Sequence, residues 1–110
     1  MLKSRTTTER SALLAVNLPP IPPGDHLRDE LDAMGISINA FSRALDVPSN
    51  RITAILKGKR AITADTALRL SCYFGTTAEF WMNLQQSYDL AVLKRERGDV
   101  IVNSVRPFAA

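Results

Sequence analysis

Apolar residues recur at intervals of three and four along most of the chain, which is the spacing of amphipathic α-helices. The first such stretch, residues 25–34, places Leu27, Leu31 and Met34 on one face. It is followed by Gly35, a residue type that often ends helices. The pattern predicts a chain made mainly of helices.

Two short helices are predicted on either side of a tight corner. The first follows Ser37, a residue type that caps helix N-termini, and carries Phe41 and Leu45 four residues apart. The corner contains Asp46, which tolerates a left-handed backbone better than most residues, and Pro48, which suits the start of a helix. Two short amphipathic helices joined in this way are typical of a helix-turn-helix motif.

The last two predicted helices follow threonines that can cap them. One follows Thr63 and is expected to bury Ala64, Ala67, Leu68, Ser71 and Cys72. The other begins at Thr76 or Thr77, where Thr76 and Glu79 have capping-box spacing, and continues to about Arg97.

This last helix is predicted to be apolar on two sides. One face carries Phe80, Trp81, Leu84, Tyr88, Ala91 and Val92, and a second carries Met82, Leu90 and Leu93. A compact five-helix domain covers one of these faces, so we expect a second copy of the chain to cover Met82, Leu90 and Leu93. The alternative is that Leu90 and Leu93 contact the C-terminal tail.

The second short helix carries the chemistry of a DNA reader. Its N-terminal end holds the side chains that we expect to contact base edges, Ser49, Asn50, Arg51 and Thr53. From residue 51 to residue 60 every formal charge is positive. Phosphate contacts are expected from Ser37, Asn39, Lys57, Lys59 and Arg60.

Three of these cations have other interpretations. Arg51 is alternatively a solvated surface charge. Lys59 and Arg60 also suit the negative end of the helix dipole, which is compatible with phosphate binding. Arg60 is alternatively a structural residue that ties the loop to the following helix.

Composition narrows the class of protein. The 110 residues, 45% of them hydrophobic, are enough for one domain with a core, and the net charge is +3. No apolar run is long enough to span a membrane, so we expect a cytoplasmic, nucleoid-associated protein. The single cysteine, Cys72, excludes an internal disulfide and is expected to be buried. His26 has no metal-ligand spacing around it, and no catalytic or phosphate-binding motif is present, so we expect neither an enzyme nor a cofactor.

Several segments resemble a known family, the Cro/C1-type (XRE) helix-turn-helix proteins, and within it the HigA-type antitoxins of toxin–antitoxin pairs. The resemblance runs roughly from Pro20 to Leu90. Its specific parts are Pro23-Gly24, GKRAITADTALRL from Gly58 to Leu70, and FGTTAEFWMNLQQSYDL from Phe74 to Leu90. The chain departs from the family at Ile38, where glutamine is usual, and at Asp46, where glycine is usual.

The resemblance implies an all-α, five-helix domain of the lambda repressor type. We expect an N-terminal arm and proline-rich linker at residues 1–22, the DNA-binding domain with a C-terminal dimerisation helix at 23–97, and a tail at 98–110 in which 100–102 forms a short strand.

The resemblance also implies partners. They are operator DNA, which a homodimer binds to repress its own operon, and a HigB-type mRNA-cleaving toxin that the chain neutralises. The arm, the first helix and the tail are candidate toxin contacts. One alternative is a stand-alone XRE-family repressor without a toxin, and another is a protein-interaction module that no longer binds DNA.

Overall fold

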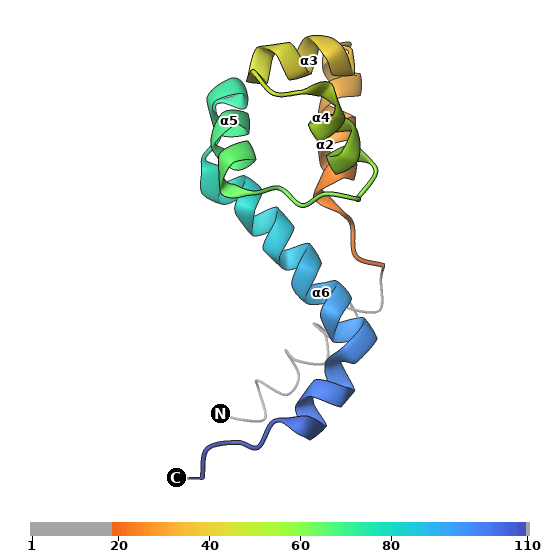
Figure 1. The fold of residues 1–110 in the computed structure, drawn as a ribbon, viewed down its shortest axis with the longest axis vertical. Coiled ribbons are helices and arrows are strands. Elements are labelled where there is room, and N and C mark those ends of the chain that lie inside the picture. The colour runs from red at the N-terminus through yellow and green to blue at the C-terminus, as the bar shows by residue number, and fades with distance from the viewer. Residues whose placement is uncertain (1–18, 110) are drawn as a thin grey trace, which may run out of the picture. The chain divides into compact units, whose positions relative to one another are not determined.

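Five helices make up most of the part of the chain that the computed structural model describes, residues 19–109 (Figure 1). They are α2 (Pro23–Met34), α3 (Ile38–Leu45), α4 (Ser49–Leu56), α5 (Ala64–Phe74) and α6 (Ala78–Ser104). The all-α prediction is confirmed. The expected arm, apart from its last residues, lies outside the described residues.

Local signals account for most helix ends. Gly35, with φ 64°, ends α2, and the Ser37 Oγ accepts a hydrogen bond of 3.1 Å from the Ala40 N–H at the start of α3. Asp46 adopts the left-handed backbone, with φ 57°, that the predicted corner needs. At α6 the cap is Thr77, whose Oγ1 accepts from the Phe80 N–H, so the expected pairing of Thr76 with Glu79 is not the one that forms.

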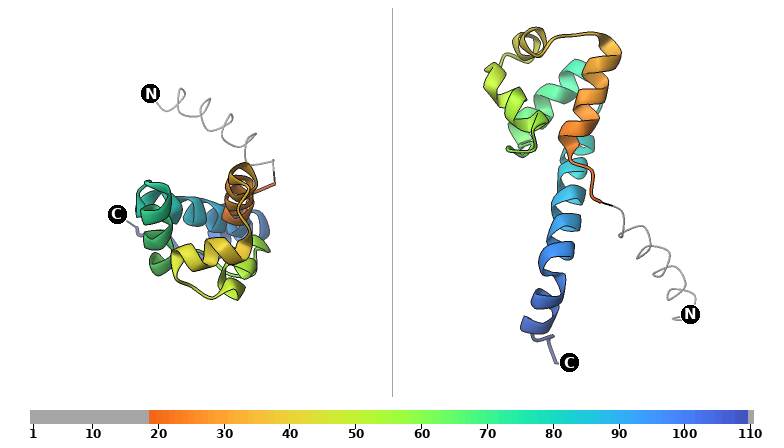
Figure 2. Two further views of the ribbon diagram at one scale, coloured as in Figure 1. Left: turned by 90° about the horizontal axis from the view of Figure 1, so that it is seen from above. Right: turned by 90° about the vertical axis from the view of Figure 1, so that its right-hand side faces the viewer.

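Residues 21–90 form one compact unit, in which α2 to α5 and the first turns of α6 enclose the core (Figure 2). Each helix contributes a side chain that is at most 1% exposed, namely Leu27, Phe41, Ile52, Leu70 and Trp81. Burying one such side chain contributes about 1.5–3 kcal/mol relative to leaving it in water. The core therefore fixes the two short helices, α3 and α4, against the longer ones.

The buried face of α5 differs from the prediction. Ala67 is buried as expected, but its neighbours in the core are Thr66 and Leu70, whereas Leu68 and Cys72 are exposed. The physical reason is aromatic packing: the Phe74 ring on the same face lies 5.9 Å from the Phe41 ring and 5.5 Å from the Trp81 ring. The expectations that Ala64, Leu68 and Cys72 are buried are wrong.

A buried polar side chain ties α6 to the loop after α4. The Gln85 Oε1 accepts a 2.7 Å hydrogen bond from the Ile62 N–H, and its Nε2 donates to Asp89 Oδ1 at 2.9 Å. Gln85 is 8% exposed, so these bonds satisfy polar groups that water does not reach freely.

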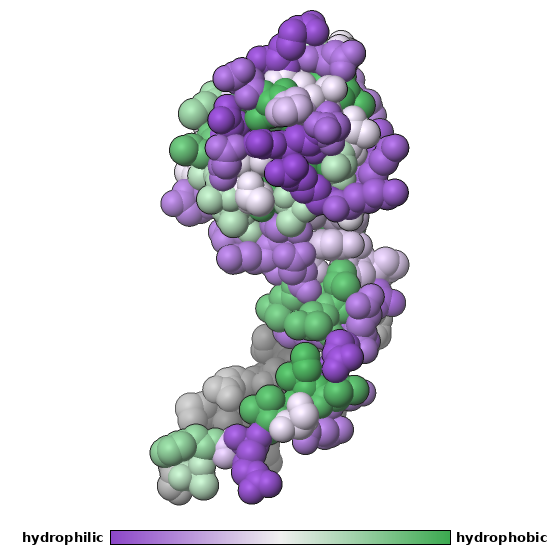
Figure 3. Space-filling view, in the orientation of Figure 1, coloured by the Kyte–Doolittle hydropathy of each residue, from purple (hydrophilic) through white to green (hydrophobic). Residues whose placement is uncertain are grey.

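From residue 91 onward the chain continues α6 to Ser104. The predictions that this helix ends near Arg97 and that residues 100–102 form a strand are therefore wrong. The β-branched run lies within the helix, which overrides its strand preference. Apolar side chains gather on this segment (Figure 3), and the exposed ones are Leu93, Val100, Ile101, Val102, Val105 and Phe108.

Helices α2 and α4 cross with their backbones in close contact. Pro23 and Gly24, which the resemblance placed before the first helix, form its first turn and are buried. A Cβ added to Gly24 would clash with the backbone oxygen of Ile55, so the two helices would have to separate. Only glycine therefore permits this crossing.

Replacing Gly24 with alanine should lower the free energy of unfolding by about 1–3 kcal/mol, because the new methyl group overpacks a contact between two backbones. The matched control is Gly98→Ala, whose Cβ would meet nothing closer than the Lys94 Cβ at 3.9 Å. Because glycine in the middle of a helix is less favourable than alanine, Gly98→Ala in α6 should raise the free energy of unfolding by about 0.5–1 kcal/mol. Urea unfolding of both variants measures the effects, and equal stabilities would contradict the assigned role of Gly24.

Candidate DNA-binding surface

Helix α4 presents a polar face opposite its buried one. Ile52, Ile55 and Leu56 pack into the core, while Ser49 and Asn50 are exposed at the N-terminal end. Hydrophilic residues gather over the part of the unit where α4 lies (Figure 3). These two side chains are therefore accessible to a partner of the size of a DNA duplex.

Thr53, the fourth residue expected to contact bases, is half-buried. Its Oγ1 donates a 3.1 Å hydrogen bond to the Ser49 backbone oxygen, one turn earlier. Because this hydrogen bond uses the hydroxyl proton, the contact that Thr53 can still offer a thymine is an apolar one through its methyl group.

The basic residues predicted to bind phosphate follow the end of α4. Lys57, Lys59 and Arg60 are all exposed, and Gly58, with φ 73°, allows the chain to turn between them. The Lys59 N–H donates to the Ala54 backbone oxygen at 2.8 Å, which fixes the turn. Three cations are thus grouped within four residues directly after α4.

The remaining two phosphate candidates lie at the start of α3. Asn39 is exposed, and Ser37 is also exposed but uses its Oγ to accept the capping hydrogen bond from Ala40. The Ser37 hydroxyl still has its own O–H to donate. The backbone N–H groups and the positive end of the helix dipole at this terminus suit an anion.

Arg51 is held by an ion pair that the sequence pattern did not suggest. Its Nη1 donates to Asp65 Oδ2 on α5 at 2.6 Å, and its side chain is 22% exposed. The Nε of Arg51 is buried and has no hydrogen-bond partner among the described residues. The guanidinium that is expected to contact a base is therefore already bound on one side.

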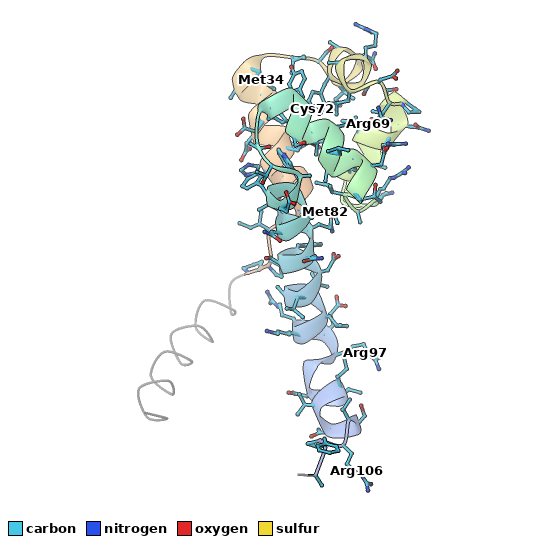
Figure 4. All side chains as sticks on the ribbon, turned by 90° about the vertical axis from the view of Figure 1, so that its left-hand side faces the viewer. Met34, Arg69, Cys72, Met82, Arg97 and Arg106 are labelled. Carbon is cyan, nitrogen blue, oxygen red and sulfur yellow. The ribbon has the colours of Figure 1, made fainter. Side chains whose placement is uncertain are left out.

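The same carboxylate binds a second arginine. Arg69 Nε donates to Asp65 Oδ2 at 3.0 Å, and Arg69 Nη1 donates to the backbone oxygens of Leu45 at 2.9 Å and Asp46 at 3.3 Å. Arg69 lies on the side of α5 that faces the helix-turn-helix (Figure 4). We call Arg51, Asp65 and Arg69 the arginine–aspartate network; it joins α4, α5 and the corner between α3 and α4.

Two hydrogen bonds hold the pKa of the Asp65 carboxyl below its ordinary value. The one from Arg69 has the larger effect and the one from Arg51 the smaller. The hydrogen bond to Asp65 in turn raises the pKa of Arg69. The carboxylate form of Asp65 is therefore the form that the fold stabilises.

Sequence reasoning missed Asp65 and Arg69. Their spacing of four residues on one helix is a readable signal for that pair. The pairing of Asp65 with Arg51, 14 residues apart on different helices, depends on how α4 packs against α5.

The residues predicted to form a dimer interface are not equivalent in the structure. Met82 is half-buried and packs against the core of its own unit. Leu90 and Leu93 are 54% and 44% exposed. Of these three residues, Leu90 and Leu93 are the ones that leave large apolar areas open to a second copy.

No group of three or more His, Cys, Asp and Glu residues arranged to hold a metal ion occurs within residues 19–109. His26 lies edge-on to the rings of Phe80 and Trp81, with both centroids 5.8 Å away. Of the helices in the described ranges, none has the length and apolar character needed to cross a membrane.

Known proteins are similar to this chain in sequence and in fold. The sequence pattern of a helix-turn-helix family matches residues 27–81. Virulence-associated protein I of Dichelobacter nodosus is 45% identical over 84 residues, which cover 76% of this chain and 78% of that protein. An addiction module antidote protein of the HigA family from Coxiella burnetii has a similar fold, with a TM-score of 0.80, 48% identity, and coverage of 83% of this chain and 100% of that one.

A second solved structure includes DNA. Antitoxin HigA of Pseudomonas aeruginosa, solved with the higBA promoter, has a TM-score of 0.77 and 44% identity, over 82% of this chain and 99% of that one.

The lowered pKa of Asp65 predicts a pH dependence of stability that Asp65→Asn should remove. The folded state binds this proton less readily than the unfolded state, so the contribution is full above about pH 4, the ordinary range for aspartate. It is lost as the pH falls through the lowered pKa. Urea midpoints of both proteins from neutral pH to about pH 2 should differ at neutral pH and converge in acid; a constant difference would contradict the assignment.

Proposed function

The chain belongs to the helix-turn-helix family, in its Cro/C1-type (XRE) group of HigA-type antitoxins, and on that premise we propose that it neutralises a HigB-type mRNA-cleaving toxin and represses its own operon. The DNA-binding part of this proposal rests on one observation, the exposed polar N-terminus of α4 beside three grouped cations. The toxin-neutralising part rests on membership of the family.

In the proposed complex, α4 enters the major groove with its N-terminal residues toward the bases. Asn50 pairs with an adenine edge and Arg51 with a guanine edge, and Ser49 and Thr53 make smaller contacts. The positioning contacts go to phosphates from Ser37, Asn39, Lys57, Lys59 and Arg60. These contacts orient the protein, whereas the α4 side chains give sequence preference.

Repression proceeds through a homodimer. Two α4 helices separated by about 34 Å read half-sites one turn of DNA apart, so the operator is expected to be a pseudo-palindrome. The exposed leucines Leu90 and Leu93 are proposed to pack against a second copy, and Met82 supports them from the core. Binding, rather than catalysis, is the proposed activity, and the proposed location is the cytoplasm, in association with the nucleoid.

A stand-alone repressor of the same family is the second candidate. It shares the DNA-binding surface and differs only in having no toxin. The gene beside this one distinguishes the two, because toxin and antitoxin pairs share an operon in the proposed arrangement.

Variants of the proposed DNA-binding residues test which side chains recognise bases and which only position the protein on the phosphates. Asn50→Ala should weaken binding by about 1–3 kcal/mol, with the loss confined to particular base pairs. Lys57→Ala should weaken binding to all sequences similarly and reduce the salt dependence by about one counterion. Fluorescence anisotropy with a set of single-base operator variants measures both, and identical sequence profiles for the two variants would refute the assignment.

Neutralisation is tested in cells. The small protein encoded beside this gene should stop growth when expressed alone, and co-expression of the full chain should restore growth. Asn50→Ala serves as the control, because a substitution on the DNA-reading face should leave neutralisation intact while weakening repression. A neighbouring product that is harmless when expressed, or a toxic one that this chain does not rescue, would favour the stand-alone repressor.

A further inference from the structure

The arginine–aspartate network contains a negative charge next to the surface that is proposed to meet DNA. Asp65 lies on α5 with its side chain 55% exposed, and its Oδ2 binds Arg51 of the reading helix. A carboxylate near DNA repels phosphate, so by charge alone it weakens binding. Its position beside Arg51 therefore needs another physical explanation.

We propose that Asp65 is a positioning residue for DNA reading, which holds the Arg51 guanidinium in the orientation from which it contacts a base edge. The inference rests on the proposed function and deepens it. It assigns to Asp65 a part in sequence preference, although Asp65 itself touches no base.

The geometry of Arg51 supports this role. Its Nη1 is fixed 2.6 Å from Asp65 Oδ2, and its Nε is shielded from solvent. A guanidinium carries five N–H donors in a rigid plane, so fixing one edge also fixes the direction of the others. The remaining N–H groups of Nη1 and Nη2 are enough for the two parallel hydrogen bonds that guanine accepts.

Asp65 is itself anchored, which makes it an effective support. Arg69 binds the same oxygen at 3.0 Å and reaches the backbone oxygens of Leu45 and Asp46 at the corner before α4. Arg69 thus connects Asp65, which supports Arg51, to the corner that sets the angle of α4. A long side chain that is ordered before DNA arrives loses less rotamer freedom on binding.

Charge and positioning predict opposite results for Asp65→Asn. If only charge mattered, removing a negative group would tighten binding to every duplex. If Asp65 positions Arg51, binding to the promoter should weaken about tenfold while binding to a scrambled duplex of the same length stays equal or tightens. The matched control is Asp32→Asn, which removes the same charge from an exposed residue on α2.

The experiment measures affinities of the full chain for the promoter DNA upstream of its own gene, for single-base variants of it, and for the scrambled duplex. The loss in Asp65→Asn should fall on the base pairs that Arg51→Ala also affects, and the double variant should lose no more than Arg51→Ala alone. A promoter profile for Asp65→Asn that matches that of Asp32→Asn would overturn the positioning role alone. Failure of the wild-type chain to distinguish promoter from scrambled DNA would overturn the proposed function as well.

A second measurement is made on the wild-type protein and uses a variant only to assign one signal. In ¹⁵N spectra of the wild-type protein without DNA, the Arg51 Nε–H should give a sharp signal that exchanges slowly with water, because the group is buried and its guanidinium is fixed. The signal is assigned by its loss in Arg51→Lys. An Arg51 signal that exchanges as fast as that of the exposed Arg60 would overturn the proposal.

Discussion

A helix of eight residues has almost no stability of its own in water, and α4, the helix proposed to read DNA, is of this length. It is stable here because its own residues Ile52 and Ile55 are buried in the core. In addition, Gly24 lets the backbone of α2 approach the Ile55 carbonyl. The precision of the proposed reading surface therefore depends on a contact on the opposite, buried side of the helix.

Two kinds of interaction hold this helix in place. Apolar burial supplies most of the stabilisation but little angular detail, since many packings of Ile and Leu have similar energy. Directional groups supply the detail: Asp65 fixes Arg51, Arg69 fixes the corner, and Gln85 fixes Ile62 in the loop that follows. These polar contacts are spaced along the segment from the start of the corner to the start of α5.

The features that sequence predicted well are those encoded within a few residues. Ser37 as a cap and Asp46 in a left-handed turn need only local chemistry, and both are confirmed. The face of α5 was mispredicted because two apolar stripes compete on it, and the choice depends on where the rings of Phe41 and Trp81 lie. The Arg51–Asp65 pair was not predictable for the same reason, because it forms only after α4 and α5 pack. The proposed contacts to DNA bases remain predictions.

The hydrogen bond from the Ile62 N–H to Gln85 has a consequence for cooperativity. It joins the loop that carries Lys59 and Arg60 to α6, five residues before Leu90, which is proposed to meet a second copy. In the proposed complex, a change in the angle of this loop on binding phosphate would reach α6 through this hydrogen bond. Thermodynamic linkage makes the relation reciprocal: the factor by which DNA tightens the association of subunits equals the factor by which association tightens the grip of each subunit on DNA.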